Sequence, residues 1–176
     1  ANVCVLLSGL GFPVKYITRL PSNDLGAAVK TQLRSYGVDT SGIAEGGDKL
    51  GLYFTENGNL LRNSKVIYDR KNSSFASLEP GMINWNEVLE NVDCFHWSGI
   101  SPALSASTAA VCREALEVCK SKRILVSTDL NYRSTLWNWG KSPAEVMPHL
   151  LAFSDIIIGD LNAASLYLDD EQLHRV

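Results

Sequence analysis

Short apolar runs alternate with helical patterns along the second half of this 176-residue chain. The apolar runs are residues 94–97, 124–128 and 155–159, and the third holds three isoleucines between Asp155 and Gly159. A continuous apolar run of this kind is typical of a strand that is covered on both faces. Strands that alternate with helices pair in parallel between layers of helices. The alternation therefore predicts a three-layer α/β/α fold with a mostly parallel central sheet.

The helices of this half are indicated by apolar spacing and by capping residues. Asn84, with Glu87 three residues on, predicts the start of a short helix at Trp85. The longest helix is predicted over about residues 105–120. Its small or apolar positions are Thr108, Cys112, Ala115, Leu116 and Cys119.

Two further helices are predicted near the end of the chain. Residues 142–145 (SPAE) have the pattern of a capping box with proline in the first turn, and Pro148 is expected to kink or shorten that helix. Leu161, Ala164 and Leu168 have the spacing of one more helix.

A helix, a strand and a second helix are predicted in the first half. Residues 1–7 look like the inside of a buried helix that ends near Gly9, and residues 14–20 alternate with a period near two, as a strand does. Asp24 is expected to cap the second helix, and Gly37 to follow its end. Its buried face is predicted to hold Leu25, Ala28, Val29, Leu33 and Tyr36.

A β-hairpin follows this helix. Residues 50–56 and 66–70 flank Asn57-Gly58, a dipeptide suited to tight turns, although residues 59–65 could lengthen the loop. This antiparallel hairpin interrupts the strand–helix alternation, so it must lie outside the main sheet.

Charge and hydropathy exclude two classes of partner. Sixteen Lys and Arg against nineteen Asp and Glu give a net charge of −3, with both signs scattered, whereas nucleic-acid binding needs a basic patch. No apolar run approaches the roughly 18 residues that would span a bilayer. We therefore expect neither a nucleic-acid nor a membrane partner.

The cysteines indicate a reducing compartment. Cys4, Cys94, Cys112 and Cys119 form no C-x-x-C pair, so neither a zinc site nor a disulfide framework is expected, and the cytoplasm fits best. The chain begins on Ala1 in what looks like the middle of a helix, so we also expect sequence upstream of it.

Polar residues follow the strand predicted at 124–128, where ligands bind in open α/β sheets. Asp129, Asn131, Tyr132 and Arg133 lie there, and the Arg133 guanidinium could hold a carboxylate or phosphate through two parallel hydrogen bonds. The alternative is that Arg133 pairs with Asp129 for structural reasons.

The hairpin offers a second candidate group. Tyr53, Tyr68 and Arg70 are candidate ligand contacts, because Tyr68 and Arg70 share a face under strand alternation. A merely solvated hairpin face is the alternative.

Other chemistry-bearing residues favour structural roles. Residues 98–101 (SGIS) could let the backbone approach a ligand but suit a structural turn better, and His96 inside a strand suits a hydrogen-bonded core histidine. Trp137 and Trp139 could stack on a base or sugar, although covering the sheet rim is the commoner use. Neither G-x-G-x-x-G after a strand nor G-x-x-x-x-G-K-[ST] occurs, which disfavours Rossmann and P-loop enzymes.

Several runs together resemble the ribokinase-like (PfkB) carbohydrate kinases over almost the whole chain. Residues 33–40 (LRSYGVDT) are similar to the family's L-x-x-x-G-V-D segment, and residues 51–53 (GLY) to the start of its lid hairpin. Within this family, the chain most resembles the branch that acts on 2-keto-3-deoxygluconate. The resemblance to this branch rests on residues 68–71 (YDRK), 96–104 (HWSGISPAL) and above all 129–137 (DLNYRSTLW).

The resemblance implies a ribokinase-like domain over residues 1–176 with residues 50–71 as its lid, ATP and Mg²⁺ as cofactors, and a homo-oligomer formed through the lid. It also implies that Asn2 binds sugar hydroxyls and that Arg70 and Arg133 suit an acid sugar's carboxylate. The implied substrate contacts are Asn2, Tyr53, Tyr68, Arg70 and Arg133.

Three departures from the family pattern stand out. Thr18 and Pro21 replace glycines of the first signature. The Asn-x-x-Glu motif that places magnesium and phosphate should fall at residues 159–162, where GDLN stands, so Asp160 and Asn162 are weak candidates for cofactor binding. The Gly-Ala-Gly-Asp motif, which supplies the anion hole and the catalytic base, is not among these residues.

The resemblance thus implies a fragment of an ATP-dependent kinase that makes 2-keto-3-deoxy-6-phosphogluconate and lacks its C-terminal nucleotide-binding part, so the chain alone should be inactive. The alternatives are another PfkB sugar kinase, of fructokinase or ribokinase type, and a non-catalytic sugar-binding module.

Overall fold

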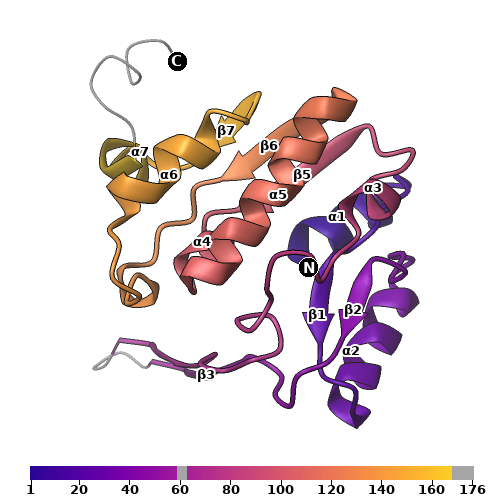
Figure 1. Cartoon of the computed structure of the whole chain (residues 1–176). Helices are drawn as coiled ribbons and strands as arrows, with labels where there is room; N and C mark the ends of the chain where they lie inside the picture. The colour runs from indigo at the N-terminus through magenta and orange to yellow at the C-terminus, as the bar shows by residue number, and fades with distance from the viewer. Residues whose placement is uncertain (59–62, 168–176) are drawn as a thin grey trace. The chain divides into compact units, whose positions relative to one another are not determined.

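The computed structural model describes residues 1–58 and 63–167 (Figure 1). The chain divides into two compact units, Ala1–Leu78 and Glu79–Val176. Within the described residues the strands form three sheets: two parallel sheets of two and three strands, and a two-stranded antiparallel hairpin. None of the described helices is long and apolar enough to cross a membrane.

The first unit contains a parallel strand pair joined by a helix. Its elements in chain order are α1 (Asn2–Gly9), β1 (Thr18–Leu20), α2 (Asp24–Ser35), β2 (Ile43–Glu45), β3 (Leu52–Glu56) and β4 (Lys65–Asp69). β1 pairs with β2 in parallel, and a bridge between Lys15 and Asp39 extends the pairing. The strand predicted at 14–20 is therefore shorter than expected.

A small apolar core holds this unit together. Its buried residues are Leu20, Leu33, Val38 and Ile43. Cys4 and Val5 of α1 pack against this core, yet no residue of α1 is fully buried. The expectation of a buried first helix is thus wrong in this structure, because among the described residues only Cys4 and Val5 of α1 pack against this core.

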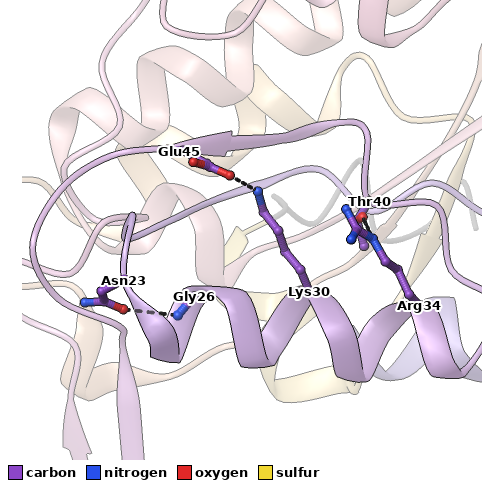
Figure 2. A network of polar contacts seen from close by, with 6 residues as sticks. All are labelled: Asn23, Gly26, Lys30, Arg34, Thr40 and Glu45. Atoms are coloured by element: carbon purple, nitrogen blue, oxygen red, sulfur yellow. Dashed lines mark hydrogen bonds and ion pairs between the residues drawn. The ribbon is translucent and has the colours of Figure 1, made fainter.

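Helix α2 is fastened by polar contacts at both ends (Figure 2). Asn23, not Asp24 as predicted, is the N-cap, and its Oδ1 accepts from Leu25 N and Gly26 N at 3.1 Å. Lys30 forms an ion pair with Glu45 of β2, and Arg34 Nε donates to Thr40 Oγ1 at 2.8 Å.

The face that α2 buries is narrower than its apolar pattern predicts. Leu33 is buried and Val29 half-buried, whereas Leu25 and Tyr36 are more than half exposed. Gly37 follows the helix end with φ +76°, as its predicted place requires.

The second unit is built on a three-stranded parallel sheet in the order β5-β6-β7. Its elements are α3 (Trp85–Val88), β5 (Cys94–Ser98), α4 (Ile100–Ala103), α5 (Ala106–Lys122), β6 (Leu125–Asp129), the 3₁₀ helix η1 (Ser134–Leu136), α6 (Pro143–Leu151), β7 (Ile156–Ile158) and α7 (Leu161–Tyr167). Figure 1 shows α5 lying along the sheet, and α5 and β6 are in contact. The predicted alternation of parallel strands and helices is confirmed in this unit.

Two helices of this unit begin with side-chain caps, of which only the one at α6 was predicted from the sequence. Ser105 accepts from Thr108 N at 3.1 Å at the start of α5. Ser142 and Glu145 form the predicted capping box of α6, which continues through Pro148 to Leu151. At α3 the expected cap is not formed, because Asn84 Nδ2 donates to the Glu87 side chain at 3.2 Å instead.

The strand β7 is the main correction to the predicted sheet. Its isoleucines are 38–56% exposed, although their continuous apolar run predicted cover on both faces. The reason is topological: among the described residues, β7 lies at the sheet edge and pairs only with β6.

Candidate functional site

Polar residues gather at the carboxyl ends of β5 and β6. The two strands end side by side, since Ser98 is the register partner of Asp129. Asn131 Nδ2 donates to Ser98 Oγ at 3.3 Å, and Asn131 N donates to Asp129 Oδ1 at 3.2 Å. Asn131 has φ +39°, so the chain turns sharply directly after the strand. The predicted polar cluster therefore exists as a hydrogen-bonded turn.

Gly99 makes this turn possible by close packing. A Cβ at Gly99 would overlap the carbonyl oxygen of Leu130 and lie 3.1 Å from its carbonyl carbon. Gly99 N donates to Asp129 O at 2.8 Å, and Leu130 is 1% exposed. These contacts support the structural interpretation of residues 98–101, which also enter helix α4, an element that the sequence analysis did not predict.

Arg133 lies exposed just beyond this turn. Its Nη1 donates to the carbonyl oxygen of Tyr132 at 2.7 Å, while the Asp129 carboxylate accepts from Asn131. These contacts do not support the alternative of a structural pair between Arg133 and Asp129. A guanidinium carries five N–H donors, so a single intrachain contact is compatible with binding an anion.

Asp160 and Asn162 lie at the start of α7. Asp160 Oδ1 accepts from Ala163 N at 2.8 Å, as a helix cap does, and the Asn162 carbonyl accepts from Ser165 Oγ at 3.0 Å. The described residues contain no group of three His, Cys, Asp or Glu side chains that could hold a metal ion. This part of the chain therefore does not fit a magnesium site, and we derive no step through the ion. The cofactor role of both residues stays a prediction.

The candidate residues of the hairpin do lie together. Tyr53 and Tyr68 are directly opposed in register, with ring centroids 6.5 Å apart, and the Arg70 guanidinium carbon lies 4.7 Å from the Tyr68 ring centroid. This distance is that of a cation–π contact. Tyr53 is 61% exposed and Tyr68 38% exposed. One face of the hairpin thus presents two phenols and a guanidinium. Asp69, which forms an ion pair with Lys49, is the register partner of Leu52 and so belongs to the other face.

The opposite face of the hairpin exposes three apolar side chains. Strand alternation and register place Leu52, Phe54 and Ile67 there, and each is between 37% and 57% exposed. The predicted turn at Asn57-Gly58 leads into residues 59–62, which lie outside the described part of the chain.

Asn2 is the remaining predicted contact. It is exposed in the first turn of α1, within the unit that carries the hairpin. Arg133, Asp160 and Asn162 belong to the second unit.

An aromatic cluster beside Arg133 was missed by the sequence analysis. The Tyr132 ring meets the buried Tyr167 ring edge to face, with centroids 5.9 Å apart and planes at 82°. Trp137 and Trp139 are half-buried, with centroids 6.0 Å apart, which supports a covering role. No local pattern could connect Tyr132 with Tyr167, because 35 positions separate them in the sequence.

The remaining polar residues have structural partners. His96 Nδ1 lies 2.7 Å from Ser127 Oγ, and burial lowers the pKa of His96, as expected for a neutral core histidine. All four cysteines are free thiols, and burial raises the pKa of Cys112 to about 12 and that of Cys119 to about 11.

Comparison with known proteins places the whole described chain in one family. The sequence profile of the pfkB family carbohydrate kinases matches residues 1–171. This chain is a PfkB family member. The resemblance of its motifs to this family, and the ribokinase-like fold expected from it, are confirmed.

Two curated relatives have kinase names. The chain is 33% identical over 138 residues to the 2-dehydro-3-deoxygalactonokinase of Haloferax volcanii, which covers 78% of the chain and 43% of the relative. It is 29% identical over 161 residues to the 5-dehydro-2-deoxygluconokinase of Bacillus subtilis, covering 90% of the chain and 49% of the relative. The chain thus spans about half the length of these relatives.

Solved structures of two kinases share the fold. The 2-dehydro-3-deoxygluconokinase of Thermotoga maritima superposes with a TM-score of 0.89 at 33% identity, over 99% of this chain and 56% of that one. A fructokinase from Xylella fastidiosa with bound ATP superposes with a TM-score of 0.79 at 25% identity, over 89% of this chain and 47% of that one.

Proposed function

We propose that this chain is the sugar-binding part of an ATP-dependent kinase that phosphorylates 2-keto-3-deoxygluconate to 2-keto-3-deoxy-6-phosphogluconate. The observation that carries the proposal is the exposed guanidinium of Arg133 at the carboxyl end of β6, in a PfkB chain whose relatives include kinases of deoxy sugar acids. A guanidinium beyond a strand end suits the carboxylate that distinguishes a sugar acid from a neutral sugar.

The residues of this chain would bind and orient the sugar acid. Arg133 and Arg70 supply charge-assisted hydrogen bonds to the carboxylate, and Tyr53, Tyr68 and Asn2 supply hydrogen-bonding groups for the hydroxyls. The hairpin formed by β3 and β4 acts as a lid that excludes water from the reacting groups. In the full-length protein the phosphoryl group would come from ATP, with Mg²⁺ as the second cofactor that the family resemblance implies.

A neutral-sugar kinase is the first alternative, supported by the fructokinase likeness. A non-catalytic sugar-acid-binding module is the second, supported by the GDLN sequence at residues 159–162 and by the use of Asp160 as a helix cap. The preferred substrate and the release of ADP discriminate between the sugar-acid kinase, the neutral-sugar kinase and the non-catalytic module.

The natural full-length protein should be tested with ATP and a panel of sugars. We expect the highest kcat/KM with 2-keto-3-deoxygluconate, lower values with its galactonate epimer and with 5-dehydro-2-deoxygluconate, and much lower values with fructose and ribose. Equal or better use of a neutral sugar would support the first alternative. Tight sugar-acid binding without ADP release would support the module.

Arg133 offers a direct test of carboxylate recognition. Arg133→Ala should raise KM for the sugar acid by roughly 10- to 100-fold, because a charge-assisted contact is worth about 1.5–3 kcal/mol. Arg133→Lys should recover little, because an ammonium cannot form the planar fork. If either variant melted far below the wild type while keeping its KM, Arg133 would be a structural residue.

We further propose that residues 1–176 belong to one ribokinase-like kinase domain with residues 50–71 as its lid, and that the protein works in the cytoplasm. The four free thiols support a reducing compartment. The exposed apolar face of the hairpin supports a homo-oligomer formed through the lid.

A further inference from the structure

The segment that carries Arg133 is anchored on one side by the sheet. Leu130 is buried, and its N–H donates to Ile158 O of β7 at 2.8 Å. The chain then turns at Asn131, whose positive φ directs residues 132 and 133 away from the strand. Residues 132 and 133 lie outside the sheet, so contacts other than strand pairing hold the guanidinium in position.

Tyr167 of α7 supplies a contact of the required kind. Its ring is 1% exposed and meets the half-buried Tyr132 ring edge to face at 5.9 Å. Arg133 Nη1 is in turn hydrogen-bonded to the Tyr132 carbonyl at 2.7 Å. The backbone of Tyr132 therefore connects a buried aromatic contact directly to the exposed guanidinium.

The contact depends on the ring of Tyr167 and not on its hydroxyl. The phenol oxygen is buried and has no hydrogen bond of standard geometry, and the unpaired indole N–H of Trp137 is the polar group that interacts with it. Burial raises the pKa of Tyr167 to about 12, so the phenol is neutral at physiological pH. Phenylalanine should therefore replace it without loss of the contact.

We propose that Tyr167 is a positioning residue for sugar-acid binding, which acts by holding the Tyr132 ring and thereby the guanidinium of Arg133. The inference rests on the proposed role of Arg133 as the carboxylate contact. Because carboxylate binding is shared by ground state and transition state, a displaced guanidinium should raise KM more than it lowers kcat.

The test is steady-state kinetics of the full-length protein with the sugar substrate that the wild type uses best. Tyr167→Leu removes the aromatic edge and should raise KM for that sugar by about tenfold, with KM for ATP and kcat nearly unchanged. Tyr167→Phe should keep the wild-type KM. Tyr132→Leu should raise KM as much, and the double variant should cost no more than either single change, because both remove one contact.

A matched control exists in the same unit. Trp85 and Phe95 form an edge-to-face pair of nearly the same geometry, with centroids 6.1 Å apart and planes at 81°, but Phe95 lies near the start of β5 and not at its carboxyl end. Phe95→Leu should lower the melting temperature about as much as Tyr167→Leu and leave KM unchanged. This control separates the effect of lost packing on the melting temperature from the effect of lost positioning on KM.

The outcomes are separable from those of the proposed function. A normal KM in Tyr167→Leu, together with a raised KM in Arg133→Ala, would overturn the positioning role alone. A normal KM in Arg133→Ala would overturn the carboxylate assignment and the inference with it. A loss of binding in Tyr167→Phe would show that the hydroxyl is the active group and would also overturn the inference.

Discussion

At the scale of single residues, glycines mark where the backbone of this chain packs most tightly. Gly26 lies in the first turn of α2, where a Cβ would overlap the Pro21 carbonyl oxygen and lie 3.2 Å from its carbon. The close approach of helix α2 to the end of β1 therefore rests on Gly26. The sequence analysis noted the departure at Pro21 but did not predict this close approach.

Gly26→Ala should lower the free energy of unfolding by about 1–3 kcal/mol, because the added methyl group forces α2 away from the end of β1. Gly9→Ala is the matched control: nothing lies within 4 Å of a Cβ at Gly9, so this change should be neutral or slightly stabilising. Urea titrations of both variants measure the difference. Equal effects at the two sites would contradict the packing argument.

At the scale of elements, the capping box of α6 predicts a dependence of stability on pH. Ser142 N and Oγ both donate to Glu145 Oε2 at 2.8 Å, and the backbone N–H of Ser142 lowers the pKa of Glu145 below its ordinary value of 4.5. A carboxyl group with a lowered pKa stabilises the folded state above its ordinary pKa. That contribution is lost as the pH falls through the lowered value.

Glu145→Gln should therefore melt below the wild type at pH 7, and the difference should shrink as the pH falls below about 4.5. Glutamine keeps the size of the side chain and removes the charge that attracts the two donors. Thermal melts of both proteins across this pH range give the measurement. A difference that stayed constant down to acidic pH would mean that the charge has no part in the cap.

At the scale of the whole molecule, the apolar face of the hairpin predicts association of the full-length protein. Ile67→Glu places a charge among Leu52 and Phe54 and should shift the protein toward monomers. Leu25→Glu is the control, since Leu25 is an equally exposed leucine on α2, away from that face. Sedimentation velocity distinguishes the species. An unchanged oligomer in Ile67→Glu would exclude the lid as the interface.

Residues 1–176 expressed alone should show no phosphotransfer with ATP and Mg²⁺, because a catalytic base of the Gly-Ala-Gly-Asp kind is not among them and general-base help typically contributes about 10²–10⁴ in rate. They should also associate, since the isoleucines of β7 are exposed at a sheet edge. Sugar-dependent ADP release would contradict the first expectation. A soluble monomer with a cooperative melt would contradict the second.

Local patterns predicted many elements of this chain, although not β2, α4 or η1. The spacing of apolar residues indicated α5 and β5, the Ser142 and Glu145 pair indicated the start of α6, and the flanks of Asn57-Gly58 indicated the hairpin. Each of these was indicated by a pattern within one segment, since helix and strand periods, caps and turn residues act locally. The face shared by Tyr68 and Arg70 follows from the same periodicity.

Burial and long-range contacts could not be predicted in this way. The isoleucines of β7 form an apolar run whose cover depends on which segment lies beside it, and the choice of Asn23 as the cap of α2 depends on where the helix starts against β1. The contact of Tyr132 with Tyr167 arises because α7 packs beside the turn after β6. Such contacts are set by the folding of distant segments together, and no pattern within one segment encodes them.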